Sequence, residues 1–495
     1  MKNFLVRFLF LIVFLWGAVL SGWAEEAKTE EAAAPEGIEQ VSPEIALPEY
    51  QLLNCRYSLG KEKDRLVFDL NKPCAYEVKF NEAKTEISIL LNASDLRKVK
   101  KITAKDKAVY AVKAEPYSLD ESKTMIRIFL NYRVPVKVMT LGEPDRLVVD
   151  VEKLFSEEQS EDLGHGVVHR SIYSGTVYGP LHIELAEAAD WSRAEAMLGI
   201  ARKDGRFSRS TLSSLAKQNK ALAAINGGYF SSAGQPLGIL VAEGKLLTYP
   251  YAARTALLIK DNGKMEISSI DYQEKFFLPD GRELTVDGLN KVRSADQLIV
   301  YDRQKGTQST GTNDFGWEVA VQNGRVIEIG AGNLTIPENG YVLSAHGIRK
   351  SEIENLALDD RLTRERKFIP DWTSQRVKYI LGGGPRLVKN GKKFITSEAE
   401  KFKADIARGR APRSALGLTK EGHLLLVAVS GRQPDYSVGF TLNELADYLL
   451  SLGAVEAMNL DGGGSTAFWA GGRIVNQPSD GQERRVSNIL LLKGK

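Results

Sequence analysis

Runs in which apolar and polar residues alternate recur along the chain from about residue 50 onward. Residues 66–70 and 126–130, for example, place an apolar side chain at every second position, which predicts strands with one face on a core. Asn-Gly pairs at 262–263, 323–324 and 390–391 separate further runs, and this dipeptide favours the two-residue turn of a β-hairpin. The pattern predicts a chain built mainly from hairpin-connected strands.

Residues 210–219 and 441–453 instead carry apolar residues at helical spacing. The second segment begins with Thr441 and Glu444, which have the spacing of a capping box. The predicted fold class is therefore α+β, with a β-rich C-terminal catalytic domain that contains a few helices, preceded by a small all-β sandwich.

The start of the chain has the features of a secretory signal, with positive charges, a short apolar run and then small residues. The stretch that follows is acidic and contains prolines, which predicts a disordered tether. The predicted division is a signal peptide at 1–24, a disordered linker at 25–49, the β-sandwich at 50–154, a second linker at 155–164 and a large domain at 165–495.

The signal predicts export to the periplasm or cell envelope, with no membrane span after signal cleavage. Lys and Arg number 66 against 63 for Asp and Glu, so the net charge of +3 gives no reason to expect nucleic acid as a partner. Cys55 and Cys74 are the two cysteines, and an oxidising compartment permits a disulfide. We predict that they are bonded to each other.

Four glycine-rich or arginine-bearing segments adjoin apolar strands, at 226–230, 382–387, 411–417 and 459–466. Glycines at strand ends let backbone N–H groups approach a ligand, and consecutive amides form concave anion sites. A tight turn is the alternative explanation for each segment. It is weakest for DGGGST at 461–466, because three glycines are entropically costly unless close approach requires them.

Several common reaction centres are absent from the sequence. The glycine-rich turns lack the lysine of a nucleotide-binding loop and the GxSxG order of a serine hydrolase, and the five histidines form no HExxH pattern. A carboxylate with arginines is the chemistry that remains, and we predict neither a cofactor nor a metal. Oxygen atoms of Asp461, Asn459 and Asp480 leave a divalent cation as an alternative, although no spacing requires one.

Taken together, the segments resemble the phosphodiester glycosidase family over about residues 165–495. The resemblance lies in AINGGYF at 224–230, GGGPRLVKNGK at 382–392, RAPRSALG at 410–417, TLNELADYLLSLGA at 441–454, NLDGGGST at 459–466, PSD at 478–480 and RRVSN at 484–488. The chain departs from the family at Ser430-Gly431-Arg432, where an Asp commonly precedes the glycine. The resemblance implies a hydrolase that cleaves the bond between a sugar anomeric carbon and a phosphodiester.

On that resemblance, Asp461 is the expected base or nucleophile and Arg413 the second catalytic residue. The residues expected to bind sugar or phosphate are Asn226, Gly227, Arg432, Gly463, Gly464, Ser465, Thr466 and Arg485. Arginine suits the phosphate because its planar fork can donate two parallel hydrogen bonds. Asp461 could instead cap its own turn, and Arg485 could be a surface charge.

The N-terminal region resembles the AMIN-type domain of periplasmic cell-wall amidases and secretins. The resemblance lies in DRLVFDL at 64–70, KPCAYEVKF at 72–80 and DRLVVDV at 145–151. It implies contact with peptidoglycan and no chemistry of its own, and a plain spacer is the alternative.

The signal and the two resemblances together predict an exported enzyme whose partner is a phosphorylated glycan of the envelope or of an exopolysaccharide. The alternative is a non-catalytic envelope scaffold that binds phosphoglycan or peptidoglycan through the same loops. A phosphodiesterase that cuts the P–O bond is a third possibility. Release of free sugar is expected of the glycosidase alone, because the scaffold releases nothing and the phosphodiesterase releases a sugar phosphate.

Overall fold

The computed structural model describes residues 49–94, 108–250, 253–372 and 375–495. The predicted signal peptide and all but the last residue of the predicted first linker lie outside these residues. The described chain consists mainly of strands with a few short helices, which confirms the predicted β-rich α+β class. Within the described residues no helix is both long enough and apolar enough to cross a membrane.

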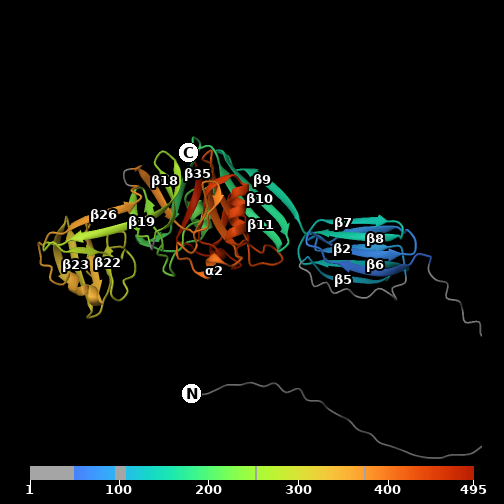
Figure 1. The fold of residues 1–495 in the computed structure, drawn as a ribbon, viewed down its shortest axis with the longest axis horizontal. Helices are drawn as coiled ribbons and strands as arrows, with labels where there is room; N and C mark the ends of the chain where they lie inside the picture. The colour runs from blue at the N-terminus through green and yellow to red at the C-terminus, as the bar shows by residue number, and fades with distance from the viewer. Residues whose placement is uncertain (1–48, 95–107, 251–252, 373–374) are drawn as a thin grey trace, which may run out of the picture. The chain divides into compact units, whose positions relative to one another are not determined.

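The N-terminal part is a sandwich of two four-stranded antiparallel sheets (Figure 1). The first sheet has the order β1-β2-β8-β7, with bounds Leu52–Ser58, Lys63–Leu70, Arg146–Glu152 and Val136–Leu141. The second has the order β3-β4-β6-β5, with bounds Tyr76–Phe80, Glu86–Leu91, Asp120–Leu130 and Val109–Tyr117. Alternate residues of both sheets fill one shared core, as the period-two pattern predicts.

The similar sequences DRLVFDL at 64–70 and DRLVVDV at 145–151 form the adjacent strands β2 and β8. Leu66 faces Val149 and Phe68 faces Leu147 across this antiparallel pair, and all four side chains are buried. The repeated motif therefore supplies the centre of one sheet. The resemblance to AMIN-type domains stays a prediction.

The predicted disulfide is not formed, because Cys55 and Cys74 are both free. Both side chains are partly buried against the sandwich core. Burial raises the pKa of the Cys55 thiol to about 12, and burial also raises that of Cys74, so both stay protonated. They act as small apolar side chains of the core.

An eight-stranded sheet carries much of the C-terminal part, in the order β29-β28-β32-β30-β31-β11-β10-β9. Its strands are Lys392–Lys393, Arg386–Lys389, Ala454–Asn459, Arg413–Thr419, Leu424–Val429, Gly179–Ala188, Val167–Thr176 and Phe155–Asp162. The last of these corrects the predicted linker at 155–164, because β9 pairs along its whole length with β10. It is a polar edge strand, exposed at nearly every position, and so lacks the alternation that would predict it.

Two further sheets pack on the eight-stranded one through a common core of side chains from all three. The five-stranded sheet has the order β12-β35-β15-β33-β34, with bounds Ala194–Ile200, Asn488–Gly494, Ala223–Asn226, Phe468–Ala470 and Arg473–Ile474. The other contains β17, β16, β27, β18, β19, β20 and β26, with bounds Lys245–Thr248, Leu240–Ala242, Val377–Gly382, Arg254–Lys260, Met265–Phe277, Glu283–Thr285 and Thr363–Ile369.

A separate small sheet lies between β20 and β26 in the sequence and was not predicted as a unit. Its order is β21-β22-β25-β23-β24, with bounds Gly288–Leu289, Leu298–Tyr301, Gly340–His346, Gly316–Gln322 and Arg325–Gly330. It has its own core. The long strand β19 leads to it, since the first half of β19 pairs with β18 and the second half with β26 (Figure 1).

Both predicted helices are present. Helix α1 spans Leu212–Gln218 after the N-cap Thr211, and α3 spans Leu442–Ser451 after Thr441. The predicted capping box forms, because Thr441 accepts from the Glu444 N–H and the Glu444 carboxylate accepts from the Thr441 N–H. A third helix, α2, is one turn long at Ala404–Ala407. The three Asn-Gly pairs also lie in turns between paired strands, as predicted.

Candidate functional site

Asp461 follows β32 directly and is held by the end of β15 in the neighbouring sheet. The backbone N–H of Asp461 donates to the Gly227 carbonyl at 3.1 Å, and the Asn226 side-chain amide donates to the Asp461 carbonyl at 2.6 Å. Asn226 is fully buried, and its own oxygen accepts from the Ser414 hydroxyl at 2.6 Å. Side chains from β15 and β30 thus fix the backbone at Asp461.

The three glycines after Asp461 allow a charged pair to approach the backbone. A Cβ atom on Gly464 would lie 2.0 Å from a guanidinium nitrogen of Arg484 and 2.4 Å from the carboxylate of Asp480. Gly463 has a φ of +60°, and a Cβ there would lie 3.2 Å from the Arg432 guanidinium. Close approach of two arginines explains the triple glycine better than turn formation alone.

Asp461 lines a pocket of about 190 Å³, which we call the Asp461 pocket. Its lining residues are Tyr229, Asp405, Ile406, Ala411, Arg413, Arg432, Asn459, Asp461, Gly462, Gly463, Gly464 and Arg484. Three arginines and two carboxylates therefore meet in a space suited to a small polar group.

The Asp461 carboxyl has an unusual proton affinity. Burial raises its pKa to about 6, against the opposing effects of the Ser465 hydroxyl, the Gly462 N–H and the positive charge of Arg484. The Gly462 N–H donates to its Oδ1 at 3.0 Å. Asp461 is therefore largely ionised at neutral pH but takes up a proton in mildly acidic solution, as a catalytic carboxylate can.

Arg413 supports the pocket wall more than it faces a ligand. It is 3% exposed, and its guanidinium donates to the carbonyls of Phe440 and Ile406, each at 3.0 Å, and to that of Gly409. Burial lowers its pKa, and the nearby charge of Arg432 adds to this effect. Arg413 lines the pocket, but its hydrogen bonds go to the 406–409 segment and to Phe440, which precedes the N-cap of α3.

Arg432 lies at the pocket with its guanidinium unpaired. It is exposed, and no other described residue forms an ion pair or hydrogen bond with its side chain. It has a positive φ of +62°, which is uncommon for a residue with a Cβ and sets the direction of its side chain. A free arginine in a pocket can take an anionic ligand without first breaking a salt bridge.

The prediction of Arg485 needs correction, because it is its neighbour Arg484 that lines the pocket. Arg484 pairs with Asp480 at 2.7 Å, and its Nη1 lies 3.5 Å from the Ser465 hydroxyl. Arg485 is exposed and is not among the lining residues. Of the two neighbouring arginines, only Arg484 therefore reaches the pocket.

The remaining predicted residues lie beneath the pocket rather than on its surface. Thr466 is buried and accepts from the Ser414 hydroxyl at 3.3 Å, while Ser465 bonds to Asp461. Asn226 and Gly227 brace the Asp461 backbone as described above. Asn226, Gly227 and Ser465 therefore contact Asp461, and Thr466 is linked to Asn226 through Ser414. Gly463 and Gly464 line the pocket itself.

Besides Arg484, the polar lining residues that were not predicted to act at the site are Tyr229, Asn459 and Asp405. Tyr229 is in the AINGGYF segment, and its hydroxyl donates to the Gly384 carbonyl at 3.0 Å and accepts from Asn459 at 3.0 Å. Tyr229 and Asn459 stand in the glycine-rich segments 226–230 and 459–466, so the sequence contained a signal for both. Asp405 comes from α2, which no motif marked, and it provides the second carboxylate of the lining.

Metal-ligating side chains do not gather in the part of the chain that the structure describes. No cluster of three or more His, Cys, Asp or Glu side chains there could hold a metal ion. Of the oxygen ligands considered above, Asp480 is paired with Arg484.

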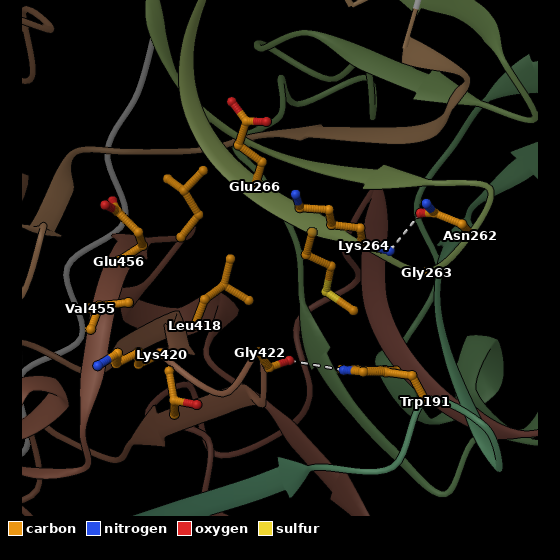
Figure 2. Close-up of a pocket in the computed structure, with 13 residues that line it drawn as sticks. Trp191, Asn262, Gly263, Lys264, Glu266, Leu418, Lys420, Gly422, Val455 and Glu456 are labelled. Atoms are coloured by element: carbon orange, nitrogen blue, oxygen red, sulfur yellow. Dashed lines mark hydrogen bonds between the residues drawn. The ribbon is translucent and has the colours of Figure 1, made fainter.

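A larger pocket of about 650 Å³ lies elsewhere, and Figure 2 shows its lining residues. These are Trp191, Asn262, Gly263, Lys264, Met265, Glu266, Ile267, Leu418, Thr419, Lys420, Gly422, Val455 and Glu456. It lies at the far ends of β30 and β32 from Arg413 and Asn459, and it shares no lining residue with the Asp461 pocket. None of the predicted site residues lies in this larger pocket.

Two solved structures share the fold. A hypothetical protein from Synechocystis has a TM-score of 0.62 and 23% identity, and the match covers 90% of this chain and 80% of that one. A protein from Burkholderia pseudomallei K96243, provisionally named as exported, has a TM-score of 0.54 and 20% identity, with 85% and 96% of the two chains covered. At these identities the likeness concerns the fold.

Sequence relatives with a named activity match a shorter segment. The bovine N-acetylglucosamine-1-phosphodiester alpha-N-acetylglucosaminidase is 32% identical over 129 residues, which are 23% of this chain and 24% of the relative. The human protein of the same name is 32% identical over 111 residues, 20% and 21% of the two chains. The matched segment thus spans about a quarter or less of these curated relatives.

A family model matches residues 315–493, a shorter range than the predicted resemblance over 165–495. AINGGYF at 224–230 falls outside this match, although the structure brings it to the pocket through Tyr229. The matched range contains Arg413, Arg432, Asp461 and Arg484. The part of the chain that carries Asp461 and the arginines of the pocket therefore matches the phosphodiester glycosidase family.

Proposed function

We propose that this chain hydrolyses sugar-1-phosphodiesters in exported or envelope glycans, at the Asp461 pocket. The observation that carries the proposal is the placement of Asp461, Arg432 and Arg484 in one pocket within the segment that matches the phosphodiester glycosidases. The activity named for the curated relatives supports the same reaction class.

In the proposed reaction the bond between the anomeric carbon and the phosphate oxygen breaks. Ionised Asp461 attacks the anomeric carbon or removes a proton from the attacking water, and the water oxygen ends on the sugar. The leaving group is a phosphate monoester, which needs less protonation than an alkoxide does. Arg432 and Arg484 would neutralise its charge, since guanidinium groups suit phosphate oxygens.

The protonation of Asp461 sets the expected pH dependence. Because only the ionised carboxylate can act as base or nucleophile, kcat/KM should fall about tenfold per pH unit below about 6, the value to which burial raises its pKa. A pH–rate profile between pH 4 and 8 measures this. A profile that is flat through pH 6, or that rises toward acid, would contradict the proposed role of ionised Asp461.

The neighbouring arginines provide a matched pair of variants. Arg484→Gln should lower kcat/KM by about 10- to 100-fold, because it removes a charge from the pocket, and Arg485→Gln should stay within about twofold of the wild type. Loss of Arg484 should also move the acid limb of the pH profile upward, since its charge lowers the pKa of Asp461. Equal effects of the two variants on kcat/KM would show that Arg484 has no specific role in the reaction.

The competing function is a scaffold that binds phosphoglycan without turnover. Incubating the purified chain with a glycosyl phosphodiester and measuring free sugar distinguishes the two, because the scaffold releases none. For the N-terminal sandwich we propose retention at the envelope by contact with peptidoglycan, on the sequence resemblance alone. Binding of the full chain to isolated peptidoglycan tests that part separately.

A further inference from the structure

A second polar pocket, of about 570 Å³, lies between the β16–β17 turn and the inserted small sheet. We call it the Arg303 pocket. Lys245, Arg303, Arg364 and Arg366 give it four cationic side chains, against two carboxylates among its lining residues. It shares no lining residue with the Asp461 pocket.

The carboxylates around the Arg303 pocket leave its cations only partly neutralised. Asp302 accepts hydrogen bonds from the Asn290 side chain at 2.7 Å and from the Gln304 N–H at 2.9 Å, and Glu338 is exposed. Glu274, from beneath, pairs with Arg364 and lies 3.6 Å from Arg366. Lys245 and Arg303 form no salt bridge with any described residue.

Two buried polar atoms at this pocket lack partners. Tyr341 is 6% exposed, and its hydroxyl forms no hydrogen bond with another described residue. The buried Nε of Arg303 has no partner in the described chain either. Both atoms belong to residues that line the cationic pocket and neither has a protein partner to give up, so a small side-chain shift would let each donate to a bound group.

The rim adds hydrogen-bonding groups suited to hydroxyls. Asn323 and Asn339, each followed by a glycine, line the pocket and are exposed. Asparagine amides both donate and accept, as sugar hydroxyls do. Cationic groups with amides at the rim favour a ligand that is both charged and hydroxylated.

We propose that the Arg303 pocket binds a sugar that carries an oxyanion, either phosphate or carboxylate, at a site separate from the Asp461 pocket. Arg303 and Tyr341 donate to the oxyanion, and Asn323 and Asn339 bind hydroxyls.

Calorimetric titration of the full chain with glucose 6-phosphate, glucuronate and glucose tests the site. The Arg432→Gln/Arg484→Gln double variant serves as the background, which removes anion binding at the Asp461 pocket and makes the test independent of the proposed reaction. At least one of the two acids should bind saturably, and glucose should bind at least tenfold more weakly. Glucose 6-phosphate alone would identify phosphate as the recognised group, and glucuronate alone would identify carboxylate.

Added to that background, Arg303→Gln should weaken binding at least tenfold and Tyr341→Phe about threefold or more, with melting temperatures unchanged because neither group has a partner to lose. Arg282→Gln is the matched control, since this exposed arginine of the same region pairs with Asp280 and does not line the pocket. Absence of saturable binding by both acids, or equal affinities of Arg303→Gln and Arg282→Gln, would overturn the proposal.

Discussion

Asp461→Asn should lower turnover at least about 100-fold while leaving the fold intact. The amide has nearly the same shape and can still accept from the Gly462 N–H and the Ser465 hydroxyl, but it cannot act as base or nucleophile. Any residual activity should lack the acid limb near pH 6. Initial rates with a glycosyl phosphodiester, at several pH values, measure both effects.

The same substitution should leave the protein at least as stable at pH 7. Because burial raises the pKa of Asp461 from 3.8 to about 6, the native state binds the proton more tightly than the unfolded state does. Ionised Asp461 therefore costs stability above pH 6, and this cost disappears as the pH falls toward 4. Allowing for its partial exposure, we expect a gain of about 1–2 kcal/mol for the Asn variant at pH 7.

A loss of stability in Asp461→Asn would instead indicate that the carboxylate caps its turn. Near-wild-type turnover in a folded variant would exclude Asp461 from the chemistry. Urea denaturation of wild type and variant at pH 5 and pH 7 separates these outcomes, since only a raised carboxyl pKa makes the difference between the proteins depend on pH.

Arg413→Lys should destabilise the protein by about 3 kcal/mol, although it preserves the charge. The guanidinium holds three backbone carbonyls in a buried position, and an ammonium group cannot reach all three. Arg408→Lys, at an exposed arginine of the same segment, should change stability by less than about 0.5 kcal/mol. Denaturant unfolding of both variants gives the comparison.

The role of Arg413 follows from that result combined with kinetics. If Arg413 mainly supports the wall of the Asp461 pocket, Arg413→Lys loses stability. The activity of this variant should then recover in part under conditions that stabilise the folded protein. A variant as stable as Arg408→Lys but strongly impaired in turnover would restore the direct catalytic role predicted from the sequence.

The elements that the sequence predicted are those with a local physical cause. The Asn-Gly turns need a positive φ, and the capping box of α3 satisfies the N-terminal N–H groups of its own helix, so short motifs were enough. Asp461 was singled out for a similar reason, because three consecutive glycines are costly without close approach.

The elements that failed depend on tertiary contacts. Strand β9 is polar along its length and exists because it pairs with β10, and the small inserted sheet begins at β21, after the continuous strand β19 has changed partner from β18 to β26. The sequence RR at 484–485 does not show which arginine faces the pocket. Nor could it show that Arg413 bonds to carbonyls 4, 7 and 27 residues away.

The position of bond cleavage tests the central proposal most directly. Hydrolysis of a glycosyl phosphodiester in ¹⁸O-labelled water, followed by mass spectrometry of both products, shows whether the anomeric carbon or the phosphorus was attacked. Cleavage of the glycosidic bond at the Asp461 pocket predicts label in the free sugar and none in the phosphate monoester. Label in the phosphate product, or no turnover by a folded chain, would contradict it.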